Sequence, residues 1–182
     1  MINLLMKKLL YTEIGPNGET YKKGDWREFA SQTEAEVRGF FGEYRFLSNF
    51  WPAQVILDGV GYSSTELAYQ AAKWQPTKRD FFLKCTELES IDYNRKNVPD
   101  KYSENEWNLV KTDIMRDLLR QKFDPKINPE NYHLLITTGD KYLEERNWWG
   151  DLYWGADKDG NGENMLGKIL MEIREELKKD QS

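Results

Sequence analysis

Apolar residues recur at the spacing of a helix in several stretches of the chain. Within residues 104–123, Trp107, Val110, Ile114 and Leu118 follow one another at steps of three or four, which predicts an amphipathic helix whose apolar face packs in the core. Residues 164–177 repeat the pattern, and residues 129–138 begin with Pro and end before Gly139, as a short helix does. The chain is therefore rich in predicted helix.

Alternating or β-branched runs predict a few short strands. Residues 53–62 form one such run around Asp58-Gly59, a dipeptide typical of a two-residue hairpin turn. Residues 11–24 predict a second hairpin, and residues 25–36 predict a short polar helix. Helices and strands together predict a single, predominantly helical α+β domain over residues 39–178, with residues 1–38 as an N-terminal extension packed on it.

Length and charge narrow the class of protein. A chain of 182 residues with 39% hydrophobic residues is long enough for one sizeable core. The formal charge is -5 and both signs are mixed along the chain, which argues against a protein that grips duplex phosphates over a long footprint. The opening run of apolar residues is short, contains lysines and lacks a small-residue cleavage site, so we expect a cytoplasmic protein without a membrane partner.

Two single residues exclude several chemistries. Cys85 is the one cysteine, so no intrachain disulfide can form, and its apolar neighbours predict a packing role rather than a nucleophile. His133 is the one histidine, which removes His-dependent triads and argues against a protein-bound zinc. No glycine fingerprint for a nucleotide cofactor is present, so we expect neither a metal nor a cofactor. The remaining chemistry must use carboxylates, a lysine, amides and aromatic rings.

Residues 41–50, FGEYRFLSNF, place four aromatic rings beside an Arg and a Ser-Asn pair. The run breaks the alternation of a simple core strand and predicts a strand that enters a shaped loop. Loops of this composition line ligand pockets, but a loop that packs its rings on a core has the same sequence pattern. Both interpretations stay open from these ten residues.

Residues 65–74, TELAYQAAKW, predict a helix that is buried nearly all round. Its polar residues Glu66, Gln70 and Lys73 fall on one arc, although Glu66 and Lys73 are about 10.5 Å apart along the axis. Buried charges usually have a partner or a function, so this stripe should face a cavity or a polar network. The alternative is a purely structural network that holds helices together.

Residues 148–155, WWGDLYWG, surround Asp151 with aromatic rings. Such a cluster suits stacking on a planar base and stabilisation of positive charge, yet it is also typical of a core. The next run, residues 156–163, imitates the start of a calcium-binding loop, but Lys168 stands where the bidentate Glu must be, so calcium is rejected. A glycine-rich turn before a helix could instead hold a phosphate, or could be a simple surface turn.

Several of these motifs, in this order, resemble the NADAR family, also called YbiA-like proteins. The resemblance covers roughly residues 39–177 and rests on residues 41–50, 62–73, 115–116, 122–123, 151–155 and 162–171. It implies a compact, mostly helical fold and cleavage of the N-glycosidic bond between a ribose and a base. The substrates it implies are phosphorylated ribosylamino-pyrimidines of riboflavin synthesis, or ADP-ribose attached to guanine, which could belong to a nucleic acid.

The resemblance also implies roles for single residues. Glu66, Lys73 and Asp151 would be catalytic. The residues that would bind substrate are Arg45, Phe46, Asn49, Phe50, Gln70, Trp154, Gly155 and Asn164. The chain departs from the family pattern at Asn94-Arg95-Lys96, where the family often has a Gly-Arg pair, so the substrate can differ.

Three functions follow as hypotheses. The first is an N-glycoside hydrolase, in which a carboxylate stabilises the oxocarbenium character that develops at C1 of the ribose. The second is a non-catalytic binding module for ADP-ribose or a related nucleotide, and the third is an interaction domain whose aromatic clusters are core. The acidic balance of the chain favours a small nucleotide over DNA as the substrate.

Overall fold

The structure is a computed structural model that describes residues 29–180, and these residues form two compact units. Residues 29–51 and 135–180 belong to the first unit, and residues 52–134 form the second. The hairpin expected over residues 11–24 lies outside the described residues.

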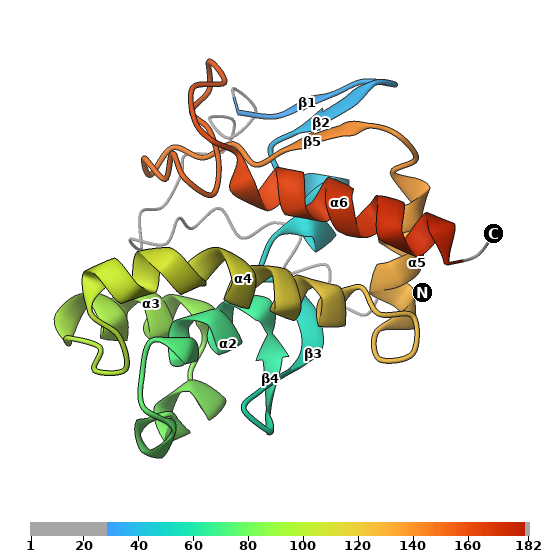
Figure 1. Ribbon diagram of the computed structural model, residues 1–182. Helices are drawn as coiled ribbons and strands as arrows, with labels where there is room; N and C mark the ends of the chain where they lie inside the picture. The colour runs from blue at the N-terminus through green and yellow to red at the C-terminus, as the bar shows by residue number, and fades with distance from the viewer. Residues whose placement is uncertain (1–28, 181–182) are drawn as a thin grey trace. The chain divides into compact units, whose positions relative to one another are not determined.

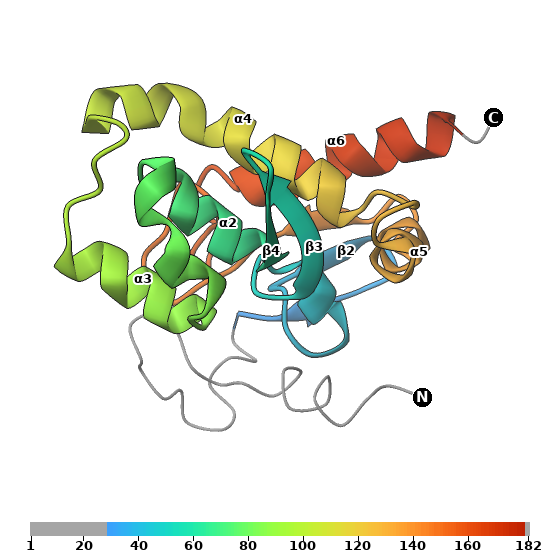
Figure 2. The same cartoon turned by 90° about the horizontal axis from the view of Figure 1, so that it is seen from below.

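The second unit is one continuous stretch of chain that folds as a hairpin followed by helices (Figure 2). Its elements are β3 (Pro52–Leu57), β4 (Val60–Ser64), α2 (Thr65–Ala72), two short 3-10 helices (Pro76–Lys78 and Asp80–Leu83), α3 (Glu87–Lys96) and α4 (Glu104–Lys122). Helix α5 (Pro129–Thr137) then carries the chain back to the first unit.

The hairpin turn is the one that the sequence predicts. Strands β3 and β4 pair antiparallel with Leu57 opposite Val60. Asp58 and Gly59 between them both have positive φ angles, 49° and 81°, as a two-residue turn of this kind requires.

Helix α2 is the centre of the second unit. The Ser64 side chain caps its start by accepting a hydrogen bond from the backbone N–H of Leu67, and all eight helical residues are buried. The helix packs against β3, β4, α3 and α4 (Figure 2). The prediction of a helix buried nearly all round is confirmed.

Helices α3 and α4 begin with the same local device. In α3 Thr86 and Glu89, and in α4 Ser103 and Glu106, form capping boxes in which each side chain bonds the other residue's backbone N–H. Such boxes fix where a helix starts, so the residues that α3 and α4 direct towards α2 are held in register.

The first unit is a small sheet with one helix against it (Figure 1). Its elements are β1 (Ser31–Gln32), β2 (Glu36–Arg38), a 3-10 helix (Gly42–Leu47), β5 (Tyr142–Glu144) and α6 (Met165–Lys179). Strand β2 pairs antiparallel with β1 and parallel with β5. The apolar stripe predicted for α6 is buried at Leu166, Ile169, Leu170 and Ile173.

A glycine permits the close contact between α6 and β5. A Cβ atom at Gly167 would lie 2.2 Å from the carbonyl oxygen of Leu143 and 2.5 Å from Oδ1 of Asn164. Neither atom lies at the end of a long flexible side chain, so any larger residue would push the helix off the strand.

Two predictions of local structure are wrong. Residues 42–47 form a 3-10 helix rather than a strand, and Gly42, with φ of 56°, opens it. Within the segment expected to be a helix, residues 25–36, the described part contains β1 and the start of β2. In both places pairing or packing within the first unit decides the backbone, which a local sequence pattern does not report.

The described residues give a predominantly helical α+β fold with a few short strands, as the sequence predicts. Across residues 29–180, no helix combines the length and the apolar character that crossing a membrane would need.

Candidate functional site

The residues predicted to form a site belong to both units. Glu66, Gln70 and Lys73 lie in the second unit, and the others lie in the first. Each group has hydrogen bonds within its own unit.

In the second unit, Gln70 joins Glu66 and Lys73 into one network. Its amide nitrogen Nε2 donates to Oε1 of Glu66 at 2.6 Å, and its oxygen Oε1 accepts from Nζ of Lys73 at 2.7 Å. Glu66 and Gln70 are only 7% and 8% exposed. The sequence placed the two charges too far apart to pair directly, and the structure bridges them through an amide.

Two aromatic rings face the ammonium group of Lys73. Its Nζ lies 5.3 Å from the ring centroid of Tyr69 and 5.5 Å from that of Trp107. The two rings are themselves 5.1 Å apart. Ring faces attract a cation, so together with the Gln70 oxygen they hold the lysine end in one place. Trp107, expected as a core residue of α4, thus contributes its ring to the site.

Asn94 joins this network although it was not predicted as a site residue. Its Nδ2 donates to Oε1 of Gln70 at 2.7 Å, and its Oδ1 accepts a hydrogen bond from Nε1 of Trp74. Asn94 lies on α3, more than twenty residues beyond Gln70 in the sequence. The sequence offered one indication that Asn94 belongs to the site, since Asn94 begins the Asn94-Arg95-Lys96 run at which the chain departs from the family pattern.

In the first unit, residues 45–50 form a compact polar and aromatic cluster. Nη1 of Arg45 donates to Oγ of Ser48 at 3.1 Å, and the Arg45 guanidinium lies 5.5 Å from the ring centroid of Phe50. Asn49 and Phe46 are buried, at 9% and 4% exposure. Arg45 and Phe50 are half-buried, so they keep surface with which to contact a ligand.

Asp151 organises the aromatic loop around it. Its Oδ1 accepts hydrogen bonds from the backbone N–H groups of Tyr153 and Trp154, at 3.2 and 2.9 Å. Asn147 brackets Asp151 by accepting from its backbone N–H and donating to its carbonyl oxygen. The carboxylate therefore has a structural task whether or not it also takes part in chemistry, and Asn147 was not predicted.

The structure gives Gly155 and Asn164 clear structural tasks. A Cβ atom at Gly155 would lie 2.7 Å from both the Asn147 side chain and the carbonyl oxygen of Glu145. The Asn164 amide accepts from the backbone N–H of Glu145 at 3.0 Å and donates to the carbonyl oxygen of Leu143 at 2.9 Å. These contacts tie the start of α6 to the end of β5, and a contact of either residue with substrate stays a prediction.

The hydrogen bonds of the glycine-rich turn over residues 156–163 argue against a phosphate site. The Asp157 carboxylate itself accepts from the backbone N–H groups of Asp159 and Asn161. At the start of α6, the N–H groups of Met165 and Leu166 donate to the carbonyl oxygens of Tyr153 and Trp154. An anion would find these donors occupied, so the simpler alternative of a surface turn holds.

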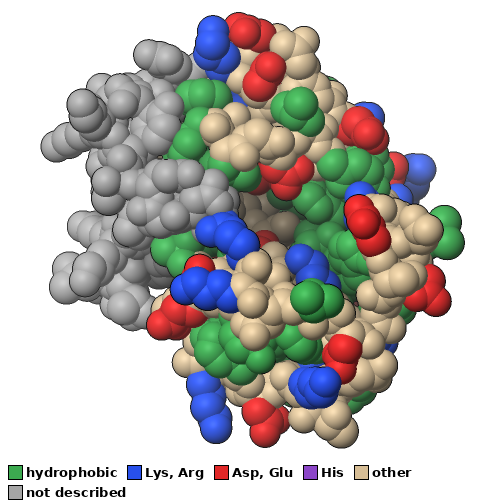
Figure 3. All heavy atoms as spheres, turned by 90° about the vertical axis from the view of Figure 1, so that its left-hand side faces the viewer, with side chains coloured by type: hydrophobic (Ala, Val, Ile, Leu, Met, Phe, Trp, Pro, Cys, Tyr) green, Lys and Arg blue, Asp and Glu red, His purple; other side chains and the backbone are tan. Residues whose placement is uncertain are grey.

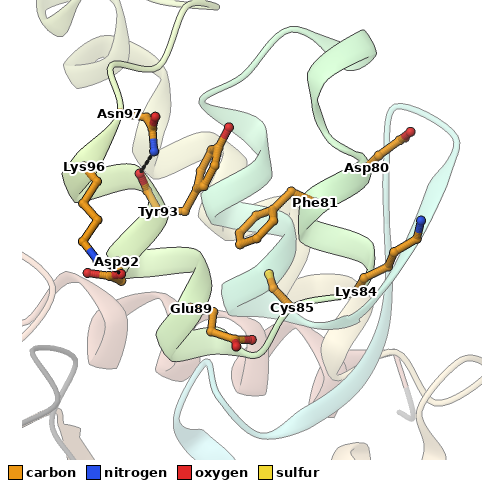
Figure 4. A pocket seen from close by; sticks show the side chains of 9 residues that line it. All are labelled: Asp80, Phe81, Lys84, Cys85, Glu89, Asp92, Tyr93, Lys96 and Asn97. Atoms are coloured by element: carbon orange, nitrogen blue, oxygen red, sulfur yellow. Dashed lines mark hydrogen bonds and ion pairs between the residues drawn. The ribbon is translucent and has the colours of Figure 1, made fainter.

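A pocket of about 550 Å³ opens on the surface of the second unit, and none of the predicted site residues is among those that line it (Figure 4). Phe81 and Tyr93 stack in it with ring centroids 4.4 Å apart. Cys85 also lines it, and burial raises the pKa of its thiol to about 11. The thiol is protonated at neutral pH, which agrees with the expectation that Cys85 is not a nucleophile.

Charges of both signs are interspersed among the described residues of one face. On the face drawn in Figure 3, Lys and Arg side chains alternate with Asp and Glu side chains, and neither kind gathers into a patch.

Comparison with known proteins gives one family. Residues 29–178 match the model of the NADAR domain. The chain is 33% identical over 137 residues to the N-glycosidase YbiA of Escherichia coli (strain K12), covering 74% of this chain and 82% of that protein. It is 31% identical over 140 residues to the N-glycosidase Npun_R5314 of Nostoc punctiforme, covering 74% and 86%.

The chain is also similar to a longer relative and to a solved structure. It is 33% identical over 132 residues to the riboflavin biosynthesis protein VVA0006 of Vibrio vulnificus (strain YJ016), but the match spans only 35% of that protein. The NMR structure of E. coli YbiA superposes with a TM-score of 0.67 and 27% identity, over 84% of this chain and 90% of that one.

Proposed function

Because the chain belongs to the NADAR domain family, we propose that it is an N-glycoside hydrolase that cleaves the bond between C1 of a ribose and a base nitrogen. The relatives of which it covers 82% and 86% are named N-glycosidases. The observation that carries the proposal is the continuous network of Glu66, Gln70 and Lys73 along α2 and its C-cap, where the remaining residues carry no charge. A buried carboxylate, joined in this way to a half-buried amine, is costly to the fold unless it is used.

The reaction requires two tasks that these residues can perform. As the C1–N bond breaks, its electron pair leaves with the base nitrogen, which must gain a proton, and positive charge develops on C1 and the ring oxygen. Glu66 can stabilise that charge and move the proton. The oxygen of a water molecule finally bonds to C1.

Lys73 has two possible roles in this reaction. In a covalent route its amine attacks C1, expels the base and leaves a Schiff base with the ring-opened sugar, which water then hydrolyses. In a direct route Glu66 activates water and the Lys73 ammonium neutralises an oxygen of the substrate. The amine must lose its proton in the covalent route, against the pull of the Tyr69 and Trp107 rings.

We propose a phosphorylated ribosylamino-pyrimidine as the substrate, and ADP-ribosylated guanine as the second candidate. The name of the Vibrio relative supports the pyrimidine, although the chain spans about a third of that protein. Arg45 would bind phosphate or hydroxyl groups, while Phe46, Phe50 and Trp154 would enclose the ribose and base, with Asn49 donating or accepting a hydrogen bond.

A non-catalytic binder of ADP-ribose or a related nucleotide is the second candidate function. The observation that favours it is the environment of Lys73, since two ring faces and an amide oxygen suit a permanent ammonium that neutralises a phosphate.

The deciding experiment is incubation of the protein with each candidate substrate, followed by mass spectrometry. We expect free base and ribose phosphate from the pyrimidine substrate, and no release by Glu66→Gln. Glu130→Gln, an exposed change on α5, serves as the control and should release product at the wild-type rate. Binding of both compounds without release of either base would favour the non-catalytic binding function. Turnover of ADP-ribosylated guanine alone would make that compound, and not the pyrimidine, the proposed substrate.

A further inference from the structure

We propose that Asn94 is a positioning residue that orients the side-chain amide of Gln70 and, through it, Glu66 and Lys73. Its effect on turnover rests on the function proposed above, whereas its effect on the Gln70 amide does not. The proposal rests on the direction in which each hydrogen bond of the network must run.

The direction is set at Trp74, because an indole N–H can donate but cannot accept. Nε1 of Trp74 donates to the side chain of Asn94, so the oxygen Oδ1 of Asn94 must face the indole. The nitrogen Nδ2 of Asn94 is thereby turned towards Gln70, where it donates to Oε1 at 2.7 Å and to the backbone carbonyl at 3.2 Å.

The same rule then fixes Gln70. Its Oε1 receives two donors, Nδ2 of Asn94 and Nζ of Lys73, each at 2.7 Å. Its Nε2 is left to donate to Oε1 of Glu66 at 2.6 Å. If the amide turned over, Nε2 would meet two donors and Oε1 would meet a carboxylate oxygen, so all of these hydrogen bonds would be lost.

Packing holds the Trp74 indole, from which this series of hydrogen bonds starts, in one place. Trp74 is 5% exposed, and its ring packs against Tyr93 and Phe82 at centroid distances of 5.3 and 6.4 Å. Asn94 follows Tyr93 directly on α3, whose start the Thr86 capping box fixes. An indole with one orientation therefore imposes one orientation on two amides in succession.

Asn94→Asp is the sharpest variant, because it keeps the shape of the side chain and its ability to accept from Trp74 but cannot donate to Gln70. Asn94→Ala removes both bonds. Asn97→Asp is the matched control, since Asn97 lies at the end of the same helix and its Nδ2 bonds the carbonyl oxygen of Tyr93, outside the network.

The first readout is proton–nitrogen NMR of the two side chains, assigned by their loss in Gln70→Leu and Trp74→Phe. We expect the Gln70 amide signals to move in both Asn94 variants and to stay in Asn97→Asp. The Trp74 indole signal should keep its hydrogen-bonded position in Asn94→Asp and lose it in Asn94→Ala. Unchanged Gln70 signals in both Asn94 variants would overturn the proposal.

The second readout separates positioning from folding. We expect kcat of Asn94→Asp to fall by about tenfold or more, the cost of one hydrogen bond in a charged network, while KM and the urea midpoint stay near the wild-type values. A wild-type kcat in a folded Asn94→Asp protein would overturn the positioning role and leave the hydrolase proposal intact. If the wild-type protein releases no base from either substrate, the hydrolase proposal fails, and the NMR result alone decides whether Asn94 orients Gln70.

Discussion

The neutral amide of Gln70 satisfies two neighbours of opposite charge, which no charged side chain could do. It offers a donor to the buried carboxylate of Glu66 and an acceptor to the half-buried ammonium of Lys73, so it bonds both charges and stands between them. A second acid or base at this position would satisfy only one of the two neighbours. The separation keeps the carboxylate and the amine available for different steps of one reaction.

Lys73 gives the clearest prediction about mechanism. We expect sodium borohydride, added during turnover, to reduce a Schiff base and leave a sugar adduct on Lys73 that peptide mass spectrometry detects. The Lys73→Arg variant should carry no adduct and be nearly inactive. Lys101→Arg is the control, because Lys101 also lies near an aromatic ring, 5.1 Å from that of Tyr102. Rapid turnover without any trapped adduct, or high activity of Lys73→Arg, would favour direct attack by water.

Two variants of Asp151 separate a catalytic role of its carboxylate from its structural role in the loop. The amide oxygen of Asp151→Asn can still accept from the N–H groups of Tyr153 and Trp154, so we expect the fold to persist while turnover falls. Asp151→Ala loses these bonds and should also lose about 1 kcal/mol of unfolding free energy, as a lost cap does. Steady-state kinetics and urea unfolding measure the two effects. Wild-type turnover in Asp151→Asn would make Asp151 purely structural.

At the scale of elements, the sequence predicted those whose signal is local. The apolar stripes of α4 and α6 and the turn at Asp58-Gly59 were predicted because spacing and a positive-φ dipeptide act within a few residues. The 3-10 helix at 42–47 and strand β1 were not, because burial decides the first, and the second pairs with β2, whose other edge pairs with the distant strand β5.

In the candidate site too, features set within one helix could be predicted, and features set by contacts between separate segments could not. The stripe on α2 could be predicted because its three polar residues share one helix. Asn94 and Trp74 could not, because their contact joins positions twenty apart on different segments. The choice between a phosphate site and a surface turn before α6 stayed open for a related reason, since the Tyr153 and Trp154 carbonyl oxygens that occupy the donors come from a separate turn.

The β3–β4 turn is anchored by a charge that should make stability depend on pH. The pKa of Asp58 lies below its ordinary value of 3.8, chiefly because Arg79 donates a hydrogen bond to it at 2.8 Å, with Lys101 adding attraction. A lowered pKa means that the ionised form stabilises the fold, so this contribution is full well above pH 3.8 and is lost as the pH falls through the lowered value.

We therefore expect Asp58→Asn to lower the unfolding free energy by about 1 kcal/mol at neutral pH, a modest figure because the carboxylate is half-exposed. Asn tolerates the positive φ of this position, so the turn itself should survive. Urea unfolding should show the difference shrinking as the pH falls below 3.8. Asp113→Asn, which removes an exposed ion pair on α4, is the control and should change the unfolding free energy little at any pH. If Asp58→Asn lowers the unfolding free energy by the same amount at every pH, the charge of Asp58 is not the cause.

At the scale of the whole molecule, one family domain contains both units, because the NADAR match runs over residues 29–178. The match begins before residue 39, where the sequence placed the domain boundary, and includes β1 and β2. We therefore propose that residues 31–38 belong to the family fold rather than to an extension.

The charge of the whole chain predicts how turnover responds to salt. With a net charge of -5 and mixed signs on the face in Figure 3, we expect binding to rely on one or two phosphate contacts. The KM for the pyrimidine substrate should then change less than about tenfold between roughly 50 and 200 mM salt, whereas a protein with many phosphate contacts loses several orders of magnitude in affinity. If the protein turns over an ADP-ribosylated duplex, and its affinity for that duplex falls by several orders of magnitude over the same salt range, nucleic acid is the substrate.

The second unit, residues 52–134, is one uninterrupted stretch, and it carries the proposed reactive stripe together with Asn94 and Trp74. Arg45, Asp151 and Trp154 come from the chain on either side of it. A single genetic exchange of this stretch between relatives would transplant Glu66 and Lys73 with their orienting amide, and would leave behind Asp151 and the substrate contacts proposed for Arg45 and Trp154. The upstream junction precedes a strand, but the downstream junction falls within α5, between Leu134 and Leu135, so a hybrid must preserve the helical phase there.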